Sequence, residues 1–159
     1  MLFVGINYEQ QEVGILIEQD TIKLLRECDA GIKMGVSAIN EVTDNVSDAR
    51  LRSRLVKCRS EHEKLEDRIR SRLDSFDDDG KEPNPIAKGM SWIKTNAMLA
   101  MDESDSTIAD LLTDGCNMGV KSLSRYLNQY KAADEYSKDI AKRLIALEAE
   151  LAEDMRGYL

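Results

Sequence analysis

The chain has 159 residues, a formal net charge of −8 at pH 7 and an aromatic content of only 5%. This length suits one domain with its own core, and an acidic chain repels a phosphate backbone, so we expect no nucleic-acid binding. No apolar run approaches the ~20 residues that span a bilayer, and the N-terminal sequence lacks the basic start of a signal peptide. The three cysteines show no disulfide-like clustering, which suits a reducing, cytoplasmic location.

Residues 1–20 are expected to form an N-terminal extension that precedes the main domain. A helix can form here, but Gly14 and the Asp20–Thr21 pair interrupt its apolar stripe. The predicted boundaries are therefore an extension at 1–20 and a helical domain at 21–159.

Four apolar stripes follow the extension, and each advances in steps of three and four residues, the period of one face of a helix. In chain order they are Leu25, Cys28, Ile32, Gly35, Ile39, Val42 and Val46; Leu51, Leu55, Cys58, His62, Leu65, Ile69, Leu73 and Phe76; Leu112, Cys116, Gly119, Leu123, Leu127 and Tyr130; and Ile140, Leu144, Leu147, Leu151 and Met155. No segment shows a convincing period of two, the mark of a strand. The fold class is therefore predicted to be all-α.

Two short breaks separate these stripes in pairs. The first covers residues 44–48, where Ser47 is the expected N-cap, and the second lies at Ala133–Asp134, where Asp134 is the expected N-cap. Because each break is only a few residues long, the flanking helices must fold back on each other. This predicts two antiparallel hairpins, at 21–76 and 107–159.

The middle connection, residues 77–106, is much longer than the other two. It opens on Asp77–Gly80 and a Pro-Asn-Pro breaker, and then carries an amphipathic segment of its own, made of Ile86, Met90, Ile93, Ala97 and Met101 with the single tryptophan, Trp92. Two hairpins joined by a long crossover with an extra helix describe a ferritin-like four-helix bundle. The apolar side of the crossover (Met90, Trp92, Met98 and Met101) must cover the bundle or a subunit mate, so a homodimer is one expectation.

Asp77, Asp78 and Asp79 also invite comparison with a calcium loop. An EF-hand needs acidic groups at alternate positions and a late glutamate, whereas Ser75 and Ile86 occupy two of those positions. We therefore expect a solvated turn that terminates the preceding helix.

The two hairpins look like copies of one another. The sequence CDAGIK at 28–33 matches CNMGVK at 116–121, and Arg54–Val56 matches Arg143–Ile145 at almost the same offset. The two related cysteines lie on helices that are predicted to run oppositely, each 18 residues from its own turn. They would be separated by roughly 14 Å along the bundle axis, too far to share one metal ion or a disulfide.

The chain resembles a bacterial group of ferritin-like domains of unassigned function, over most of residues 20–158. The residues that carry this resemblance are Asp29-Ala30-Gly31 with Gly35, Val46–Leu51, Trp92-Ile93-Lys94 and Cys116–Tyr126. The resemblance implies a ferritin-like bundle, in a superfamily that includes di-iron oxidases, rubrerythrins and ferritins.

The di-iron site of that superfamily is not intact in this chain. Such a site needs an inward Glu on two helices and an inward Glu-x-x-His on the other two. His62 is the only histidine and is preceded by Arg59 in place of Glu, while Glu148 is followed by Leu151 in place of His. Counting from the turns, the facing stretches 30–33 and 117–120 offer no carboxylate, although Glu27 and Asp29 lie within one turn.

A smaller metal site is one interpretation of the remaining residues. Cys58 and His62 are four residues apart on one helical face, Cys28 is expected to lie nearly level with His62, and Glu148 can approach from the fourth helix. Iron or zinc would suit such a set. The other interpretation is plain packing, with cysteines as small buried hydrophobes and His62 hydrogen-bonded to Glu148.

Nucleophilic catalysis by Cys58 with His62 has less support, because no oxyanion-hole loop accompanies the pair and a buried seam gives a substrate little access.

Residues 50–72 are locally basic, with nine Lys and Arg against four Asp and Glu. This helix is either a solvated face or a surface for an acidic partner, including an acidic surface of a second copy.

Two functions follow from these residues. The favoured one is a ferritin-like bundle without an intact di-iron site, acting as a non-catalytic binding or structural module without a cofactor. The alternative is a metal-binding protein or oxidoreductase with a site at Cys28, Cys58, His62 and Glu148.

Overall fold

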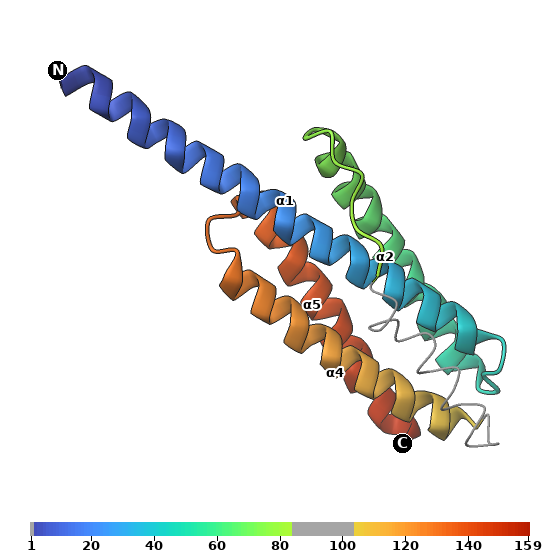
Figure 1. The fold of residues 1–159 in the computed structure, drawn as a ribbon. Helices are drawn as coiled ribbons and strands as arrows, with labels where there is room; N and C mark the ends of the chain where they lie inside the picture. Colours follow the sequence, from blue (N-terminus) through green and yellow to red (C-terminus); the bar gives the residue numbers. More distant parts are fainter. Residues whose placement is uncertain (1, 84–103) are drawn as a thin grey trace.

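The computed structural model of this chain describes residues 2–83 and 104–159. Four long α helices form the described part: α1 (Leu2–Thr43), α2 (Ala49–Asp74), α4 (Asp105–Gln129) and α5 (Glu135–Met155), with a short 3-10 helix η1 (Arg156–Tyr158) after α5 (Figure 1). No strand occurs within these two ranges, so the all-α prediction is confirmed. The predicted crossover segment at 86–101 lies outside the described residues.

The helices pack as two antiparallel pairs, α1 with α2 and α4 with α5, and α4 runs opposite to α1 (Figure 1). Backbone contacts fix one end of this arrangement. The N–H groups of Ser47 and Asp48, in the α1–α2 turn, donate to the two carboxylate oxygens of Asp105 at the start of α4, each at 2.8 Å. The beginning of α4 therefore lies beside the end of α1.

The opposite end of the bundle is fixed by α1 and the α4–α5 turn. The Ala132 N–H donates to Asp20 at 3.0 Å, and the Asp134 N–H donates to the Thr21 hydroxyl at 2.8 Å. Arg72, near the end of α2, also reaches Asp134 at 2.7 Å. These contacts bring three helices together at the same end.

One predicted cap is confirmed and one is wrong. Asp134 caps α5, because its side chain accepts the Ser137 N–H. At α2 the N-cap is Asp48 rather than Ser47, since the Asp48 carboxylate accepts the N–H groups of Arg50 and Leu51. A carboxylate also suits the positive end of a helix dipole better than a hydroxyl does. The Ser47 N–H is bonded instead to Asp105 of α4.

The core consists of two apolar clusters, one toward each end of the bundle. The cluster near the α1–α2 turn includes Ile39, Val42, Leu51, Leu55, Cys58, Ile108, Leu112, Cys116, Leu151 and Met155. The cluster near the α4–α5 turn includes Leu24, Leu25, Cys28, Ile32, Leu65, Ile69, Leu123, Ile140 and Leu144. Each fully buried aliphatic side chain contributes about 1.5–3 kcal/mol of transfer free energy, so these stripes are the main source of stability.

The first helix continues through the residues that interrupt its apolar stripe. α1 runs without a break from Leu2 to Thr43, through Gly14 and the Asp20–Thr21 pair. The polar side chains of Asp20 and Thr21 accept N–H groups of the α4–α5 turn, so they attach α1 to the bundle. Gly14 costs a helix about 1 kcal/mol, which a long helix tolerates.

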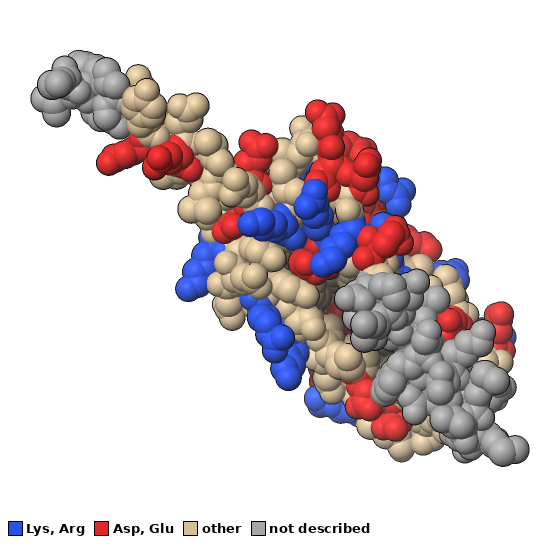
Figure 2. Space-filling model, in the orientation of Figure 1, with Lys and Arg blue, Asp and Glu red and all other residues tan. Residues whose placement is uncertain are grey.

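The first half of α1 projects beyond the bundle as a single helix (Figures 1 and 2). Residues 7–19 are all exposed, and the first buried residue of α1 with a described side chain is Thr21. Among the helices of 2–83 and 104–159, none has a stretch long and apolar enough to cross a bilayer.

Candidate functional site: a buried histidine–glutamate centre

The two apolar clusters are separated by a polar centre to which all four helices contribute. His62 of α2 is 0% exposed, and its Nε2 lies 2.8 Å from Oε1 of Glu148 on α5. Gly35 of α1 and Gly119 of α4 face this pair from the other two helices. The expectation that His62 is hydrogen-bonded to Glu148 is therefore confirmed.

Both ring nitrogens of His62 face hydrogen-bond acceptors. Nδ1 lies 2.8 Å from the backbone carbonyl oxygen of Cys58, one turn earlier on α2, and Nε2 faces the Glu148 carboxylate. An imidazole satisfies two acceptors at once only when both nitrogens carry protons. The geometry therefore describes an imidazolium paired with a carboxylate inside the bundle.

The electrostatics of the centre agree with this protonation. Burial by itself lowers the pKa of His62, but hydrogen bonds with Cys58 and Glu148 and the charge of Glu148 outweigh it and raise that pKa to about 10. His62 is therefore positively charged at neutral pH. A buried pair of this kind is costly to break, because removal of one partner leaves the other charge without compensation.

Two glycines leave the space that the pair occupies. A Cβ on Gly35 would lie 3.5 Å from both Oε1 of Glu148 and Nε2 of His62, and a Cβ on Gly119 would lie 3.3 Å from Oε2 of Glu148. Sequence reasoning placed both glycines on apolar stripes without assigning them this role. The signal was available, because a glycine on a buried helical face lets a neighbouring group approach the backbone closely.

The count from the turns was right for one hairpin and wrong for the other. Glu148 faces Gly119, within the predicted stretch 117–120, but His62 faces Gly35 rather than residues 30–33. The carboxylates expected within one turn of the centre, Glu27 and Asp29, are paired with Lys81 and Lys33 instead. No carboxylate of α1 is therefore bonded to the pair.

The three cysteines are all buried and occupy different surroundings. Cys58 Sγ lies 3.5 Å from Nδ1 of His62, and Cys116 lies near Glu148, where burial and the Glu148 charge strongly raise the pKa of its thiol. Cys28 belongs to the other apolar cluster, and burial together with Glu27 and Asp29 raises the pKa of its thiol to about 12. Both thiols are thus held in the protonated form, which is a poor nucleophile and a poor metal ligand.

Of the four predicted metal ligands, the structure brings together Cys58, His62 and Glu148 and places Cys28 in the apolar cluster beyond them. The three do not form a ligand set, because Cys58 approaches Nδ1 of the ring while Glu148 approaches Nε2. One ion cannot bind both sides of an imidazole. Within the described residues, no group of three or more His, Cys, Asp and Glu side chains is arranged to hold a metal.

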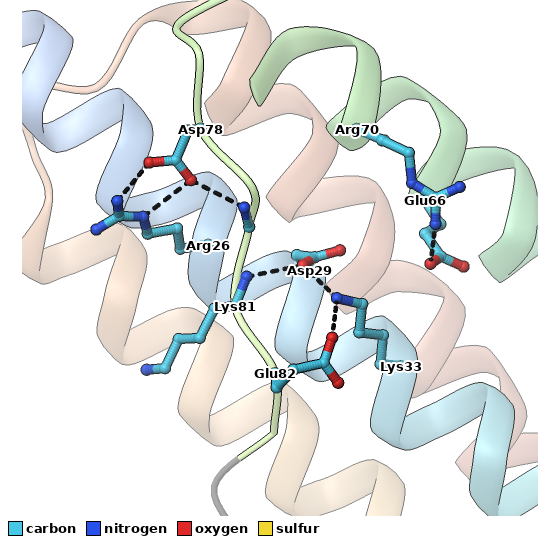
Figure 3. Close-up of polar contacts among 9 residues, drawn as sticks. Arg26, Asp29, Lys33, Glu66, Arg70, Asp78, Lys81 and Glu82 are labelled. Carbon is cyan, nitrogen blue, oxygen red and sulfur yellow. Dashed lines mark hydrogen bonds and ion pairs between the residues drawn. The ribbon is translucent and has the colours of Figure 1, made fainter. Parts of the chain in front are cut away.

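A further cluster of polar side chains joins the acidic turn after α2 to α1 (Figure 3). Asp78 is bonded to Arg26 and accepts the Gly80 N–H at 2.9 Å, and the Arg26 guanidinium holds the pKa of Asp78 below its usual range. Asp29 is bonded to Lys33 and accepts the Lys81 N–H, each at 2.9 Å. These carboxylates attach the segment to α1.

A surface pocket beside this turn is lined by Asp29, Lys33, Arg70, Leu73, Asp74, Asp78 and Asp79. Its lining mixes carboxylates with two cations, and two of the carboxylates already accept hydrogen bonds. The turn ends α2, as predicted, with left-handed backbone at Asp77 and Gly80 (φ 55° and 83°).

Comparisons with protein-family models, with curated proteins and with solved structures find no match to this chain. The ferritin-like resemblance therefore stays a prediction from the residues quoted above.

Proposed function

We propose that this chain is a non-catalytic binding or structural module: a four-helix bundle of ferritin-like type in which the di-iron centre is replaced by one His–Glu pair. The bundle serves as a rigid body, and the projecting half of α1 is the element with which it meets other molecules.

The single observation that carries this proposal is the enclosure of the pair. The side chains of His62 and Glu148 are 1% and 13% exposed, and the surface pocket described above lies at the acidic turn, away from them. The ring of His62 is fixed by bonds to Cys58 and Glu148, so neither nitrogen is free to accept a proton from a substrate. A buried polar layer of this type selects one register of the helices in some bundles.

Among the described residues, no contact supports the alternative function of a metalloprotein or oxidoreductase. It would require the Nε2 proton of His62 to be replaced by an ion and Cys58 to leave the Nδ1 side of the ring.

Elemental analysis of untagged protein, purified without oxygen, tests the proposal most directly. We expect iron and zinc well below one per chain and a melting temperature that is unchanged by a chelator. His62→Gln is the control variant, because it keeps a hydrogen-bonding side chain but cannot form the imidazolium. About one equivalent of metal that disappears in His62→Gln would contradict the proposal.

Thiol labelling provides an independent check on access to the centre. Cys58 and Cys116 are 0% and 4% exposed, so we expect labelling to be slow in the folded protein and complete in denaturant. One rapidly labelled cysteine in the native protein would indicate an open, reactive site.

A further inference from the structure

The exposed half of α1 has a mixed acidic and apolar face. Glu9, Glu12, Val13 and Leu16 follow the i, i+3, i+4, i+7 spacing that places residues on one side of a helix. Val13 and Leu16 are 57% and 52% exposed. Residues 7–19 contain three Glu residues and neither Lys nor Arg, so this projecting helix is purely acidic.

The outward face of α2 carries the opposite charge to the exposed half of α1. Ser53, Val56, Lys57, Ser60 and Lys64 share one exposed side of that helix at the spacing i, i+3, i+4, i+7, i+11, and Val56 is 40% exposed. α2 as a whole carries nine Lys and Arg against five Asp and Glu. Many of its other cations are paired, for example Arg54 with Asp154 and Arg72 with Asp134.

Lys57 and Lys64 form no ion pair among the described residues. They are seven residues apart, so they lie on one line along the helix. The serines and Val56 beside them have small side chains, so another helix can approach the two lysines closely.

These two faces cannot meet within one molecule. α1 is a single uninterrupted helix, so its first half continues along the helix axis away from the bundle (Figure 1). α2 packs against α1 and α5 through its buried side, which leaves Ser60 and Lys64 on the side that faces away from the core. Contact between the two faces therefore requires two molecules.

Pairing of two projecting helices with each other is disfavoured because both are acidic. Like charges that face each other along a helix pair are destabilising, whereas opposite charges select the partner and its register. The basic face of α2 on a second copy provides that opposite charge.

We propose that this chain forms a reciprocal homodimer in which the Glu9–Glu12–Val13–Leu16 face of each α1 docks on the Ser53–Lys64 face of the partner's α2. The proposal rests on the proposed function and names its partner, a second copy. A reciprocal contact closes on itself, whereas a one-way contact of this kind would generate a filament.

The lengths of the two surfaces are compatible. The eight residues from Glu9 to Leu16 span about 12 Å, which fits within the about 18 Å spanned by the 12 residues from Ser53 to Lys64.

Sedimentation equilibrium of the full chain measures the predicted dimer. We expect a dimer at about 100 µM, where a contact with a micromolar Kd is saturated, and weaker association in 1 M salt, because exposed ion pairs are screened. A monomer under all these conditions would overturn the proposal.

A matched pair of variants tests the α1 face. Leu16→Glu should convert the protein to a monomer, while Ile15→Glu should leave it dimeric. Both residues are 52% exposed and neighbours in sequence, but they are about 100° apart around the helix. Equal effects of the two variants would contradict docking through the proposed face.

A charge exchange tests the α2 face and the identity of the partner. Glu9→Lys/Glu12→Lys in one chain, or Lys57→Glu/Lys64→Glu in another, should each raise the homodimer Kd about tenfold or more. Mixing the two variant chains should restore a heterodimer, because each acidic face then meets a basic one. Loss of the dimer in Leu16→Glu without any effect of the α2 variant would show that the projecting helices pair with each other instead.

The two proposals fail in different ways. If the protein is monomeric and binds no metal, the dimer proposal is wrong and the proposal of a non-catalytic module stands. If the protein binds about one metal per chain and His62→Gln loses it, the proposal of a non-catalytic module is wrong, whatever the oligomeric state.

Discussion

The two halves of α1 share one continuous helix and differ in everything around it. Leu24, Leu25, Cys28 and Ile32, in the inner half, are each 0% exposed, whereas Leu16 and Ile15, about two to five turns earlier, are each 52% exposed. The inner half is surrounded by α2, α4 and α5, and the outer half has no described neighbour. A continuous backbone therefore does not imply continuous packing, and the two halves should respond differently to the same substitutions.

The largest expected effect lies at the centre of the packed half. His62→Ala should lower the free energy of unfolding by about 3–5 kcal/mol, because it leaves the Glu148 carboxylate buried without its partner. Urea denaturation followed by circular dichroism measures this loss.

An apolar double variant is the control for that experiment. His62→Leu with Glu148→Leu removes both members of the pair, so it should recover most of the stability that His62→Ala loses. If the double variant is as unstable as His62→Ala, the charge pair is not what makes the single variant costly.

Two leucines of α1 compare its halves directly. Leu25→Ala removes a side chain with 0% exposure and should cost about 2–5 kcal/mol, whereas Leu16→Ala removes one with 52% exposure and should change the free energy of unfolding by less than about 0.5 kcal/mol. Denaturation at low protein concentration keeps the proposed dimer out of the comparison. Similar costs would show that the outer half is packed against the bundle.

The pH dependence of stability reports the protonation of His62. Because the pKa of His62 is raised from its usual 6.5 to about 10, the folded protein keeps a proton that the unfolded chain loses as pH rises above 6.5. The stabilisation is therefore complete below pH 6.5 and is lost as pH rises toward 10, by up to about 1.4 kcal/mol per pH unit.

Measurements between pH 6.5 and 7.5 isolate this effect, because the raised thiol pKa values of Cys28 and Cys116 add a slope of the same sign only above about pH 8, where the unfolded thiols begin to ionise. His62→Gln should be nearly independent of pH in this range. A wild-type slope equal to that of His62→Gln would mean that the centre holds no extra proton.

The period of the apolar residues was enough to predict the helices and most of the core. Leu25, Leu55, Leu112 and Leu144 lie on the predicted stripes and are buried, because a step of three and four is imposed by helical geometry alone. The His62–Glu148 bond was one of two interpretations that the sequence left open, and the structure contains it. The sequence did not predict that Gly35 faces His62. Which residue of α1 lies opposite His62 depends on the axial offset between α1 and α2, and the length of the turn does not determine that offset.

Side-chain roles at the bundle ends were harder to predict than burial. Asp20 and Thr21 interrupt the apolar stripe in the sequence, and only the position of the α4–α5 turn shows that they accept its N–H groups. The separation of Cys28 from Cys116 was anticipated, because two copies on oppositely running helices lie at different heights. Cys28 and Cys116 indeed belong to different clusters.

The smallest effect is expected from a substitution at Gly14, in the outer half of α1. A Cβ at this position would meet nothing within 4 Å, so Gly14→Ala gains only the intrinsic helix preference of alanine, about 1 kcal/mol. In the monomer, studied at low protein concentration, residues 7–19 are exposed, so that gain should remain local. Hydrogen exchange should slow at the amides around Gly14, while the midpoint of urea unfolding stays unchanged. A midpoint that rises with Gly14→Ala would show that the outer half of α1 unfolds together with the bundle, and the two halves would then form one cooperative unit.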